Sequence, residues 1–412
     1  MMAGAPSTSD AIAPLPQYAH APVLLLIIGF LMLQPLSTDL YLASFPSLAK
    51  VFGAPASTVQ LTLSMFVIAF GGAQLIIGPL SDRYGRRPVL LWGLSLYVCA
   101  SLLCAAAPGI DWLIGARFLQ ALGCCSAIII GRAIVRDAYA PADSVRVIAR
   151  ASTWLALAPL CGPILGSYLQ VTFGWRAAFI ALSLLSAVLL GAVALRLPET
   201  NVHKNPRATE WTGLTANWRL VLGTREFWAH ALPGALSYGS IFAFISGSSL
   251  VLIRVLQVPT EWFGYCFACG VSGYMGGTIL CRRLLPRFGA AVTLRIGSSM
   301  SLAAGALFLM AVGFGLAHWS IVVAAMFLTM GAHGVNFPVS QSGSVKPFPQ
   351  QAGTAAGLMG ALYMSVAFVV GSAVGASVDG TLYPLAAIAC TLGIAIFASV
   401  RLIGSRLVHA AP

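Results

Sequence analysis

The composition of this chain is that of a protein embedded in a membrane. Of its 412 residues, 58% are hydrophobic and only 8% are charged, with a mean hydropathy of +0.88, whereas a soluble domain carries about 25% charged residues. The formal net charge of +12 does not indicate nucleic-acid binding, because the arginines lie in short connections between apolar stretches. The apolar stretches have helical length, which excludes a barrel of ~10-residue strands.

Twelve apolar stretches follow one another along the chain, and we expect each to cross the bilayer as a helix. They lie at about 22–46, 57–78, 88–107, 110–131, 147–171, 175–197, 227–253, 261–282, 290–314, 317–339, 353–377 and 381–402. Residues 1–21 lack the basic start and the cleavage site of a signal peptide. We expect them, like residues 403–412, to form a short cytoplasmic tail.

One long polar connection, residues 198–226, divides the predicted spans into two sets of six. It separates 22–197 from 227–402, and the triplet at 83–85 after the second span has a weak echo at 287–289 after the eighth. The expected fold is therefore an all-α integral membrane protein, with twelve helices in two pseudo-symmetric six-helix bundles. The chain contains no P-loop, so we expect no ATP-driven step.

The connection at 78–88 predicts the orientation of the chain. It carries one acid and three arginines between two spans, and short positive loops stay on the cytoplasmic side. With this connection inside, the outer loops carry only Lys50, Arg176 and Arg254. Because the number of spans is even, both termini are expected in the cytoplasm.

Two charged side chains lie well inside the predicted spans, Asp39 in the first and Arg117 in the fourth. A charge at membrane depth is costly and is by default a functional candidate. Both lie roughly 10 Å below the outer surface at 1.5 Å per residue, which is compatible with one shared cavity. Burial favours the neutral form of a carboxylic acid and a nearby arginine favours the charged form, so Asp39 is a candidate proton carrier. The alternative is a permanent structural ion pair.

Other polar and aromatic residues in the spans are candidates for a substrate cavity: Gln34, Tyr41, Gln120, Trp154, Tyr238, Phe242, His333 and Asn336. His333 is a possible proton relay, although a single histidine in a membrane helix more often hydrogen-bonds a neighbouring helix. The aromatic rings fit packing roles equally well. We expect no metal and no cofactor, because the Cys266-x-x-Cys269 pair has no second pair or histidine cluster beside it.

The fifth span contains two prolines and several glycines between residues 158 and 166. A proline inside a helix removes a backbone hydrogen bond, and glycine lets a neighbouring helix approach closely. We therefore expect a helix bend against another helix, centred on Gly162, Pro163 and Gly166.

These motifs carry a family resemblance that covers essentially the whole chain. The 78–88 connection, with Gly78, Leu80, Asp82, Arg83, Gly85, Arg86 and Arg87, resembles the loop 2–3 signature of the major facilitator superfamily, and Arg117, Gln120 and Gly123 resemble its span 4 motif. The fifth span is similar to the antiporter motif of proton-coupled drug exporters with twelve spans. Residues 37–42, 132–137, 174–179 and 244–248 resemble the Bcr/CflA group of multidrug efflux transporters.

The resemblance implies a proton-coupled antiporter of the bacterial inner membrane. It would act as a monomer, not an enzyme, exporting small amphipathic drugs of phenicol, bicyclomycin or sulfonamide type by alternating access, with Asp39 as proton carrier. It also implies a conformational latch made of Gly78, Asp82, Arg83, Gly85, Arg86 and Arg87. In the outward-facing state Asp82 would then face the start of the eleventh span near Gly353, where the helix dipole favours an anion.

Two departures and two alternatives qualify this expectation. The first span has no second acid between Phe30 and Gln34, where some relatives carry one, which favours a monocation or a neutral drug over a dication. Ala158 and Ser167 stand where the span 5 pattern favours glycine. An exporter of an endogenous metabolite, amino acid or small peptide would have the same fold. A channel or membrane-embedded enzyme fits less well, because no catalytic cluster lies at one depth.

Overall fold

The computed structural model describes residues 20–408, apart from 140–142, 145–146, 148–149, 152–153, 156 and 203. Within this part of the chain every regular element is a helix. Residues 1–19 and 409–412 of the two predicted tails lie outside the described residues.

The first half of the chain forms the N-terminal bundle. Its elements are α1 (His20–Asp39), the 3-10 helix η1 (Leu42–Ser44), α2 (Phe45–Phe52), α3 (Ala56–Tyr84), α4 (Arg86–Ala105), α5 (Ile110–Ala138), α7 (Ala158–Phe173) and α8 (Arg176–Arg196). The first predicted span is not one continuous helix, because α1 ends at Asp39 and the chain resumes as η1 and α2. A proline in the first turn of α2 suits this restart, since its missing N–H group has no intrahelical partner there.

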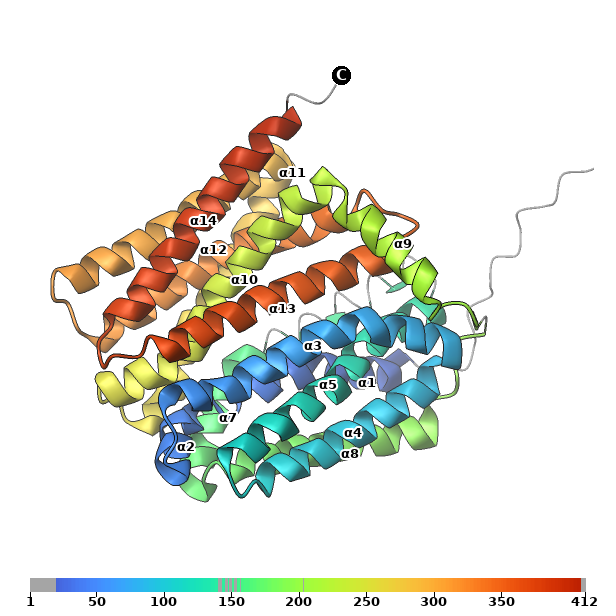
Figure 1. Ribbon diagram of the computed structural model, residues 1–412, viewed down its shortest axis with the longest axis horizontal. Helices are drawn as coiled ribbons and strands as arrows, with labels where there is room; N and C mark the ends of the chain where they lie inside the picture. Colours follow the sequence, from blue (N-terminus) through green and yellow to red (C-terminus); the bar gives the residue numbers. More distant parts are fainter. Residues whose placement is uncertain are drawn as a thin grey trace, which may run out of the picture.

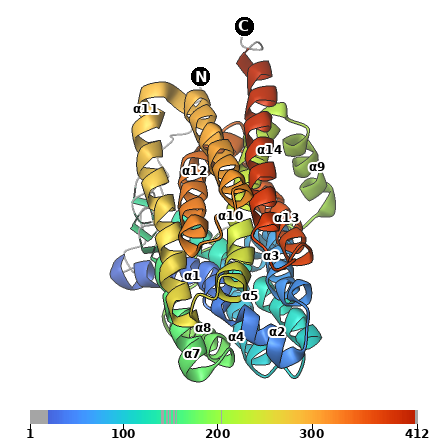
Figure 2. The ribbon, with the colours of Figure 1, turned by 90° about the vertical axis from the view of Figure 1, so that its left-hand side faces the viewer.

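The second half forms the C-terminal bundle after a linker helix, α9 (Trp211–Leu222). Its elements are α10 (Arg225–Ser249), the π-helix η2 (Leu250–Val255), α11 (Thr260–Gly313), α12 (Trp319–Val345), α13 (Ala352–Ala376) and α14 (Tyr383–Val408). The 54 residues of α11 are two helices, because Gly289 has non-helical backbone angles (φ 72°, ψ 174°). The chain reverses there, and Figure 2 shows the two arms of α11 running back along each other.

Ten described helical segments are long and apolar enough to cross a membrane. One of the ten is α11, whose two arms correspond to two predicted spans. The 16 residues of α7 follow the incompletely described stretch 145–156 and correspond to the end of the fifth predicted span. Counting both arms of α11 and adding α7 gives twelve helices, so the prediction of a multi-pass, twelve-helix membrane protein is confirmed.

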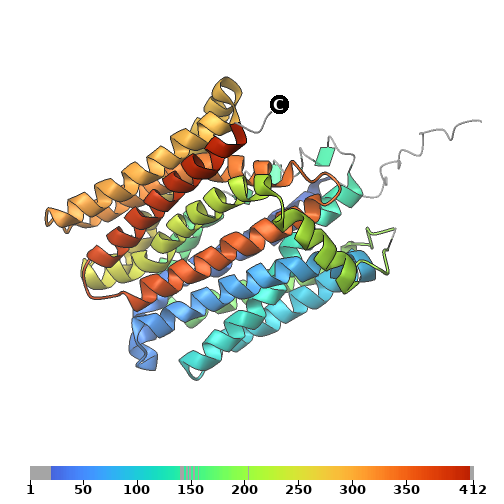
Figure 3. The ribbon, with the colours of Figure 1, turned by 45° about the horizontal axis from the view of Figure 1, so that its top comes forward.

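The two bundles lie side by side and meet along two pairs of helices (Figures 1 and 3). The α3 helix runs along α13, and α7 packs against α11. The largest buried hydrophobic cluster contains residues of both bundles, including Phe66 and Phe242. The linker helix α9 lies at the end of the molecule where α3 finishes, and Arg83 at that end donates a hydrogen bond to Thr209 just before α9.

The contact between α3 and α13, which we call the seam, depends on glycine. At Gly375 a Cβ atom would lie 2.7 Å from the Cβ of Gln60, and at Gly371 it would lie 3.1 Å from the hydroxyl of Ser64. Further along, Gly71 of α3 faces Met364 of α13 in the same manner. The absence of a side chain at these positions lets the two bundles approach at backbone distance.

Candidate functional site

Asp39 is the last residue of α1 and is buried, with 4% of its surface exposed. Its carboxylate accepts a hydrogen bond of 2.8 Å from the Thr38 hydroxyl. The carboxyl end of a helix carries the negative end of the helix dipole, so this position disfavours a negative charge. Burial acts in the same direction. The structure therefore places the deep acid of the first span at the buried carboxyl end of α1.

The glycines of the fifth span hold α7 against the break in the first span. A Cβ atom at Gly162 would lie 3.3 Å from the Cβ of Asp39, and Gly166 leaves no room for a side chain because the backbone of Leu40 lies against it. Pro163 stays within the helix, and its carbonyl oxygen and Ile164 pack against Gly264 of α11. This segment thus packs closely against the carboxyl-bearing end of α1.

Arg117 is fully buried but does not pair with Asp39. Its guanidinium donates hydrogen bonds to the carbonyl oxygens of Ser37 (2.9 Å) and Thr62 (3.3 Å) and to the side-chain oxygen of Gln120. It also lies over the rings of Tyr41, at 4.5 Å, and of Phe66, at 4.2 Å. Since Ser37 belongs to the last turn of α1, Arg117 caps the helix that ends at Asp39. The permanent ion pair considered as an alternative is not formed in this structure.

Tyr41 and Gln120 lie beside Arg117 in the N-terminal bundle. The Tyr41 hydroxyl lies 3.3 Å from the Thr62 hydroxyl, and the Gln120 amide donates to Ser101 at 2.8 Å. Both side chains are fully buried inside the N-terminal bundle. In this structure both of these predicted cavity residues contact Arg117.

An aromatic cluster of the C-terminal bundle approaches the first span at Gln34. Tyr238 interacts with the side chain of Gln34 and lies within electrostatic reach of Asp39. Ring centroids around Tyr238 lie 4.7 Å away at Tyr363, 6.1 Å at Phe337 and His333, and 6.4 Å at Phe242. The aromatic cluster is defined as these five residues: Tyr238, Phe242, His333, Phe337 and Tyr363. It joins α10, α12 and α13, and its Tyr238 reaches Gln34 of α1.

The remaining predicted cavity residues lie in different places. His333 is buried, and its Nδ1 atom lies 3.0 Å from the Ser237 hydroxyl, which ties α12 to α10. Asn336 donates to Ser301 at 3.0 Å and so faces the second arm of α11. The side chain of Trp154 is 55% exposed. Of the candidates, the structure thus brings Gln34, Tyr238, Phe242 and His333 together.

Two members of the aromatic cluster were missed by the sequence reasoning. Phe337 follows His333 by one helical turn, and Tyr363 lies among the small residues of α13. Tyr363 also interacts with the side chain of Gln74 in α3, so it reaches the N-terminal bundle. Tyr363 could have been singled out as a large aromatic residue in a helix rich in glycine and alanine. Neither residue carries a charge, which is the feature that marks a functional candidate in a membrane helix.

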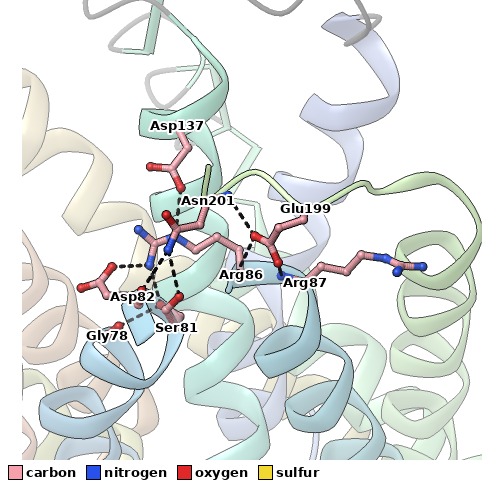
Figure 4. Close-up of polar contacts among 8 residues, drawn as sticks. All are labelled: Gly78, Ser81, Asp82, Arg86, Arg87, Asp137, Glu199 and Asn201. Atoms are coloured by element: carbon pink, nitrogen blue, oxygen red, sulfur yellow. Dashed lines mark hydrogen bonds and ion pairs between the residues drawn. The ribbon is translucent and has the colours of Figure 1, made fainter. Parts of the chain in front are cut away.

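Arg86 is the centre of the 78–88 connection (Figure 4). Its guanidinium contacts Asp82 at 2.5 Å, Ser81 at 2.6 Å and, across to α5, Asp137 at 2.9 Å. The Ser81 hydroxyl in turn donates to the Gly78 carbonyl at 2.9 Å. The contact of Asp82 with the start of α13 was expected for the outward-facing state, and Asp82 makes a different contact in this structure. Asp82 is held by Arg86 instead, and a side chain at Gly353 would meet open space.

Glu199, at the start of the linker, was not predicted to take part in this loop. Its carboxylate accepts hydrogen bonds from the backbone N–H groups of Arg86 (2.8 Å) and Arg87 (3.2 Å), the first residues of α4. Gly85 has φ 108°, and a Cβ atom there would collide with the Glu199 carboxylate. Asn201 donates to the Asp82 carbonyl at 3.1 Å. The linker is therefore held on the 78–88 connection by hydrogen bonds to backbone groups. Such bonds are hard to predict from a sequence because every residue has a backbone.

Comparisons with known proteins agree with this architecture. A model of the Major Facilitator Superfamily matches residues 26–372. The chain is 27% identical to the bicyclomycin resistance protein homolog of Haemophilus influenzae, over 88% of this chain and 91% of that protein. It is 32% identical to a chloramphenicol resistance protein of Pseudomonas aeruginosa, over 82% and 80%.

A solved structure has the same fold. The crystal structure of a bacterial homolog of the human lysosomal transporter Spinster, in an inward-facing and unoccupied conformation, superposes with a TM-score of 0.64. The match covers 94% of this chain and 95% of that chain at 16% identity, so it bears on the fold alone. From the family match, the twelve helices and the paired bundles, the chain belongs to the Major Facilitator Superfamily, a family of membrane transporters and not of enzymes.

Proposed function

We propose that the chain is a proton-coupled antiporter that exports small amphipathic drugs by alternating access, with Asp39 as the proton carrier. The observation that carries the proposal is the place of Asp39: it is buried at the broken end of α1, against Gly162 of α7, and lies within electrostatic reach of Tyr238 of the other bundle. A group between two bundles changes its surroundings when the bundles move. The other acids of the described chain lie in connections or at the ends of helices.

Proton exchange follows from the change of surroundings. While the carboxyl group is dry and next to the negative end of the α1 dipole, its neutral form is favoured. When the bundles separate and water reaches it, the charged form is hydrated and the proton leaves. Arg117 keeps its place in both situations because its partners all belong to the N-terminal bundle. One carboxyl group then carries one proton per cycle.

The aromatic cluster supports an amphipathic cargo. Its rings offer flat apolar surface, and the hydroxyls of Tyr238 and Tyr363 and the amide of Gln34 offer hydrogen bonds beside it. The names of the relatives point to bicyclomycin and chloramphenicol, both small molecules with polar groups. With Asp39 as the only deep acid, we propose neutral molecules or monocations, of phenicol, bicyclomycin or sulfonamide type, as cargo.

We place the 78–88 connection, the linker and both termini on the cytoplasmic face of a bacterial inner membrane, with the protein as a monomer. The many arginines of the connections at that end support this orientation. In this arrangement the bundles span 22–197 and 227–402, and the latch residues act on the cytoplasmic side. Asp82 is held by Arg86 here and would be free to meet the start of α13 when that side closes.

The test is transport by the purified full chain in proteoliposomes, with radiolabelled chloramphenicol as probe and an imposed pH gradient. We expect Asp39→Asn to abolish gradient-driven transport at normal levels of folded protein, because an amide binds no proton in this pH range. Asp111→Asn is the matched control, since that carboxylate lies exposed at the start of α5, and it should transport like the wild type. Gradient-driven transport by a folded Asp39→Asn protein would contradict the proposal.

A further inference from the structure

The helices α4 and α8 are joined in the same way at both of their ends. Arg87, the second residue of α4, donates to the carbonyl oxygen of Ala194 in the last turn of α8, at 2.8 Å. Arg176, the first residue of α8, donates to the carbonyl oxygen of Ala105, the last residue of α4, at 3.1 Å. Each arginine therefore caps the carboxyl end of the neighbouring helix.

The two ends differ in the tryptophan that accompanies the arginine. The guanidinium of Arg176 lies over the ring of Trp175, at 4.3 Å, and Trp175 is only 4% exposed. At the other end Trp92 is 79% exposed, and within the described part of the chain no ring covers the Arg87 guanidinium. A hollow of about 350 Å³ is present there instead, lined by Arg87, Pro88, Leu91, Trp92 and Ser95.

The Arg87 guanidinium has unused hydrogen-bond donors. A guanidinium has five N–H donors, and among the described residues the Arg87 side chain donates to Ala194 alone. Its Nε atom is buried without a partner. The three acids of Figure 4 are engaged elsewhere, two with the side chain of Arg86 and one, Glu199, with backbone N–H groups. An anion in the hollow would supply both the missing charge and the missing acceptors.

The hollow lies at the depth where lipid headgroups meet the acyl chains. The helix α4 has 20 residues and is apolar enough to cross a membrane, and its length of about 30 Å matches the hydrocarbon core. Arg87, at its start, is therefore at the membrane surface, and Trp92 lies about 7.5 Å deeper. Because α4 packs on α5 and α8, on the side of the N-terminal bundle away from the C-terminal bundle (Figure 1), the hollow faces lipid and not the seam.

We propose that this hollow is a binding site for an anionic phospholipid, with the phosphate on the Arg87 guanidinium and the start of an acyl chain against Leu91 and Trp92. The planar guanidinium matches the oxygens of a phosphate in pairs, and basic hollows at a membrane surface suit anionic headgroups. Arg196, the exposed last residue of α8, adds a second cation at this end, which favours an anionic over a zwitterionic lipid. At about 30 Å³ for each water-sized group, the hollow holds a headgroup of roughly ten non-hydrogen atoms.

The experiment measures lipid binding to the purified full chain by native mass spectrometry. The probes are phosphatidylglycerol and phosphatidylcholine with the same acyl chains. The variants are Arg87→Gln and Trp92→Ala. The matched control is Arg176→Gln, which loses the same kind of hydrogen bond to a helix end at the other surface. Thermal unfolding in detergent shows whether each variant is folded.

We expect the wild type to bind phosphatidylglycerol about fivefold more tightly than phosphatidylcholine, because the choline cation meets the two arginines. Arg87→Gln should weaken phosphatidylglycerol binding about tenfold, since a hydrogen bond from a charged donor is lost. Trp92→Ala should weaken the binding of both lipids, because the ring supplies the apolar wall. Arg176→Gln should bind both lipids like the wild type.

Equal binding of the two lipids by the wild type would overturn the proposal, since the contact would then be that of any surrounding lipid. Binding like the wild type in folded Arg87→Gln does so too, as does an equal loss in Arg176→Gln. If Arg87→Gln does not fold, Trp92→Ala decides, because its exposed ring can be removed without opening the core, and unchanged binding there contradicts the proposal. Displacement of the lipid by millimolar inorganic phosphate would mark a simple anion site and would also contradict it.

Discussion

Arg117 is a buried cation whose partners are carbonyl oxygens, an amide oxygen and aromatic faces. Hydrogen bonds from a charged donor contribute about 1.5–3 kcal/mol each, and a desolvated cation over an aromatic ring about 2 kcal/mol. These gains offset the several kcal/mol that burying the charge costs. What the arrangement achieves is geometric: α1, α3 and α5 are joined at the last turn before Asp39.

We expect Arg117→Lys to lower transport at least about tenfold and to lower the melting temperature. A lysine keeps the charge, but its single ammonium group cannot reach the Ser37 and Thr62 carbonyls and Gln120 together, and losing one charged hydrogen bond of about 1.5 kcal/mol already corresponds to tenfold. Transport in proteoliposomes and thermal unfolding in detergent measure the two effects.

The control is Arg176→Lys. Arg176 also donates to a backbone carbonyl, that of Ala105 at 3.1 Å, and also lies over a ring, that of Trp175 at 4.3 Å, but it is exposed and far from Asp39 in the chain. It should transport like the wild type. Equal losses in both variants would show that Arg117 has no special connection with Asp39.

For single residues, the sequence predicts candidate functional residues more reliably than it predicts the contacts of their side chains. Asp39 and Arg117 are predictable because charge is rare at membrane depth. The absence of an ion pair between them is not predictable. Arg117 instead donates to the backbone carbonyl of Ser37, and a carbonyl that every residue has leaves no signal in the sequence. Phe337 and Tyr363 were missed for a related reason: uncharged rings in membrane helices do not stand out until their neighbours are known.

Among the helices, the first span differs most from its prediction. Hydropathy runs without interruption from residue 22 to 46, but α1 ends at Asp39 and η1 begins at Leu42. The break is held from outside the segment, by Arg117 on the Ser37 carbonyl and by the close approach of Gly166 to Leu40. Tertiary contacts of this kind override local helix propensity, and they cannot be predicted from the residues of the segment itself.

Glu199 gives α4 a carboxylate at its N-terminal end, where the helix dipole and unpaired N–H groups favour a negative charge. We expect Glu199→Gln to destabilise the folded protein by about 1 kcal/mol, the typical value of such a cap. The linker should also detach from the loop more readily. A lower melting temperature and faster proteolysis of residues 198–210 are the measurements.

The matched variant is Glu210→Gln in the same linker. That carboxylate is exposed and lies 3.7 Å from the guanidinium of Arg207, which is also exposed, and an exposed ion pair contributes little. It should melt and be cleaved like the wild type. If Glu199→Gln also does so, the cap does not stabilise the loop.

For the whole molecule, the number and order of spans were predictable, because lipid forces every backbone polar group into a helix and hydropathy records each crossing. The pairing of α3 with α13 and of α7 with α11 was not, since glycine faces look alike in a sequence. The proposed orientation follows from the distribution of charge among the connections.

We expect a fluorescent protein fused after residue 412 to be bright in a bacterial host and alkaline phosphatase at the same place to be inactive. The reverse pattern is expected for reporters inserted after Gly315, in the turn between α11 and α12, which the proposed orientation puts outside. Because opposite signals are expected at the two sites in one host, each reporter fusion serves as the control for the other. Matching signals at both sites would contradict an orientation in which the chain end and this turn lie on opposite faces.

The solitary position of Asp39 has an electrical consequence. A cycle that brings in one proton and expels an uncharged molecule moves one elementary charge across the bilayer, so 100 mV of membrane voltage contributes about 2.3 kcal/mol to each turnover. Expelling a monovalent cation instead makes the exchange electroneutral, and voltage no longer acts on it. Collapsing the voltage with a potassium ionophore, while the pH difference is kept, should therefore sort the molecules this transporter carries by their charge.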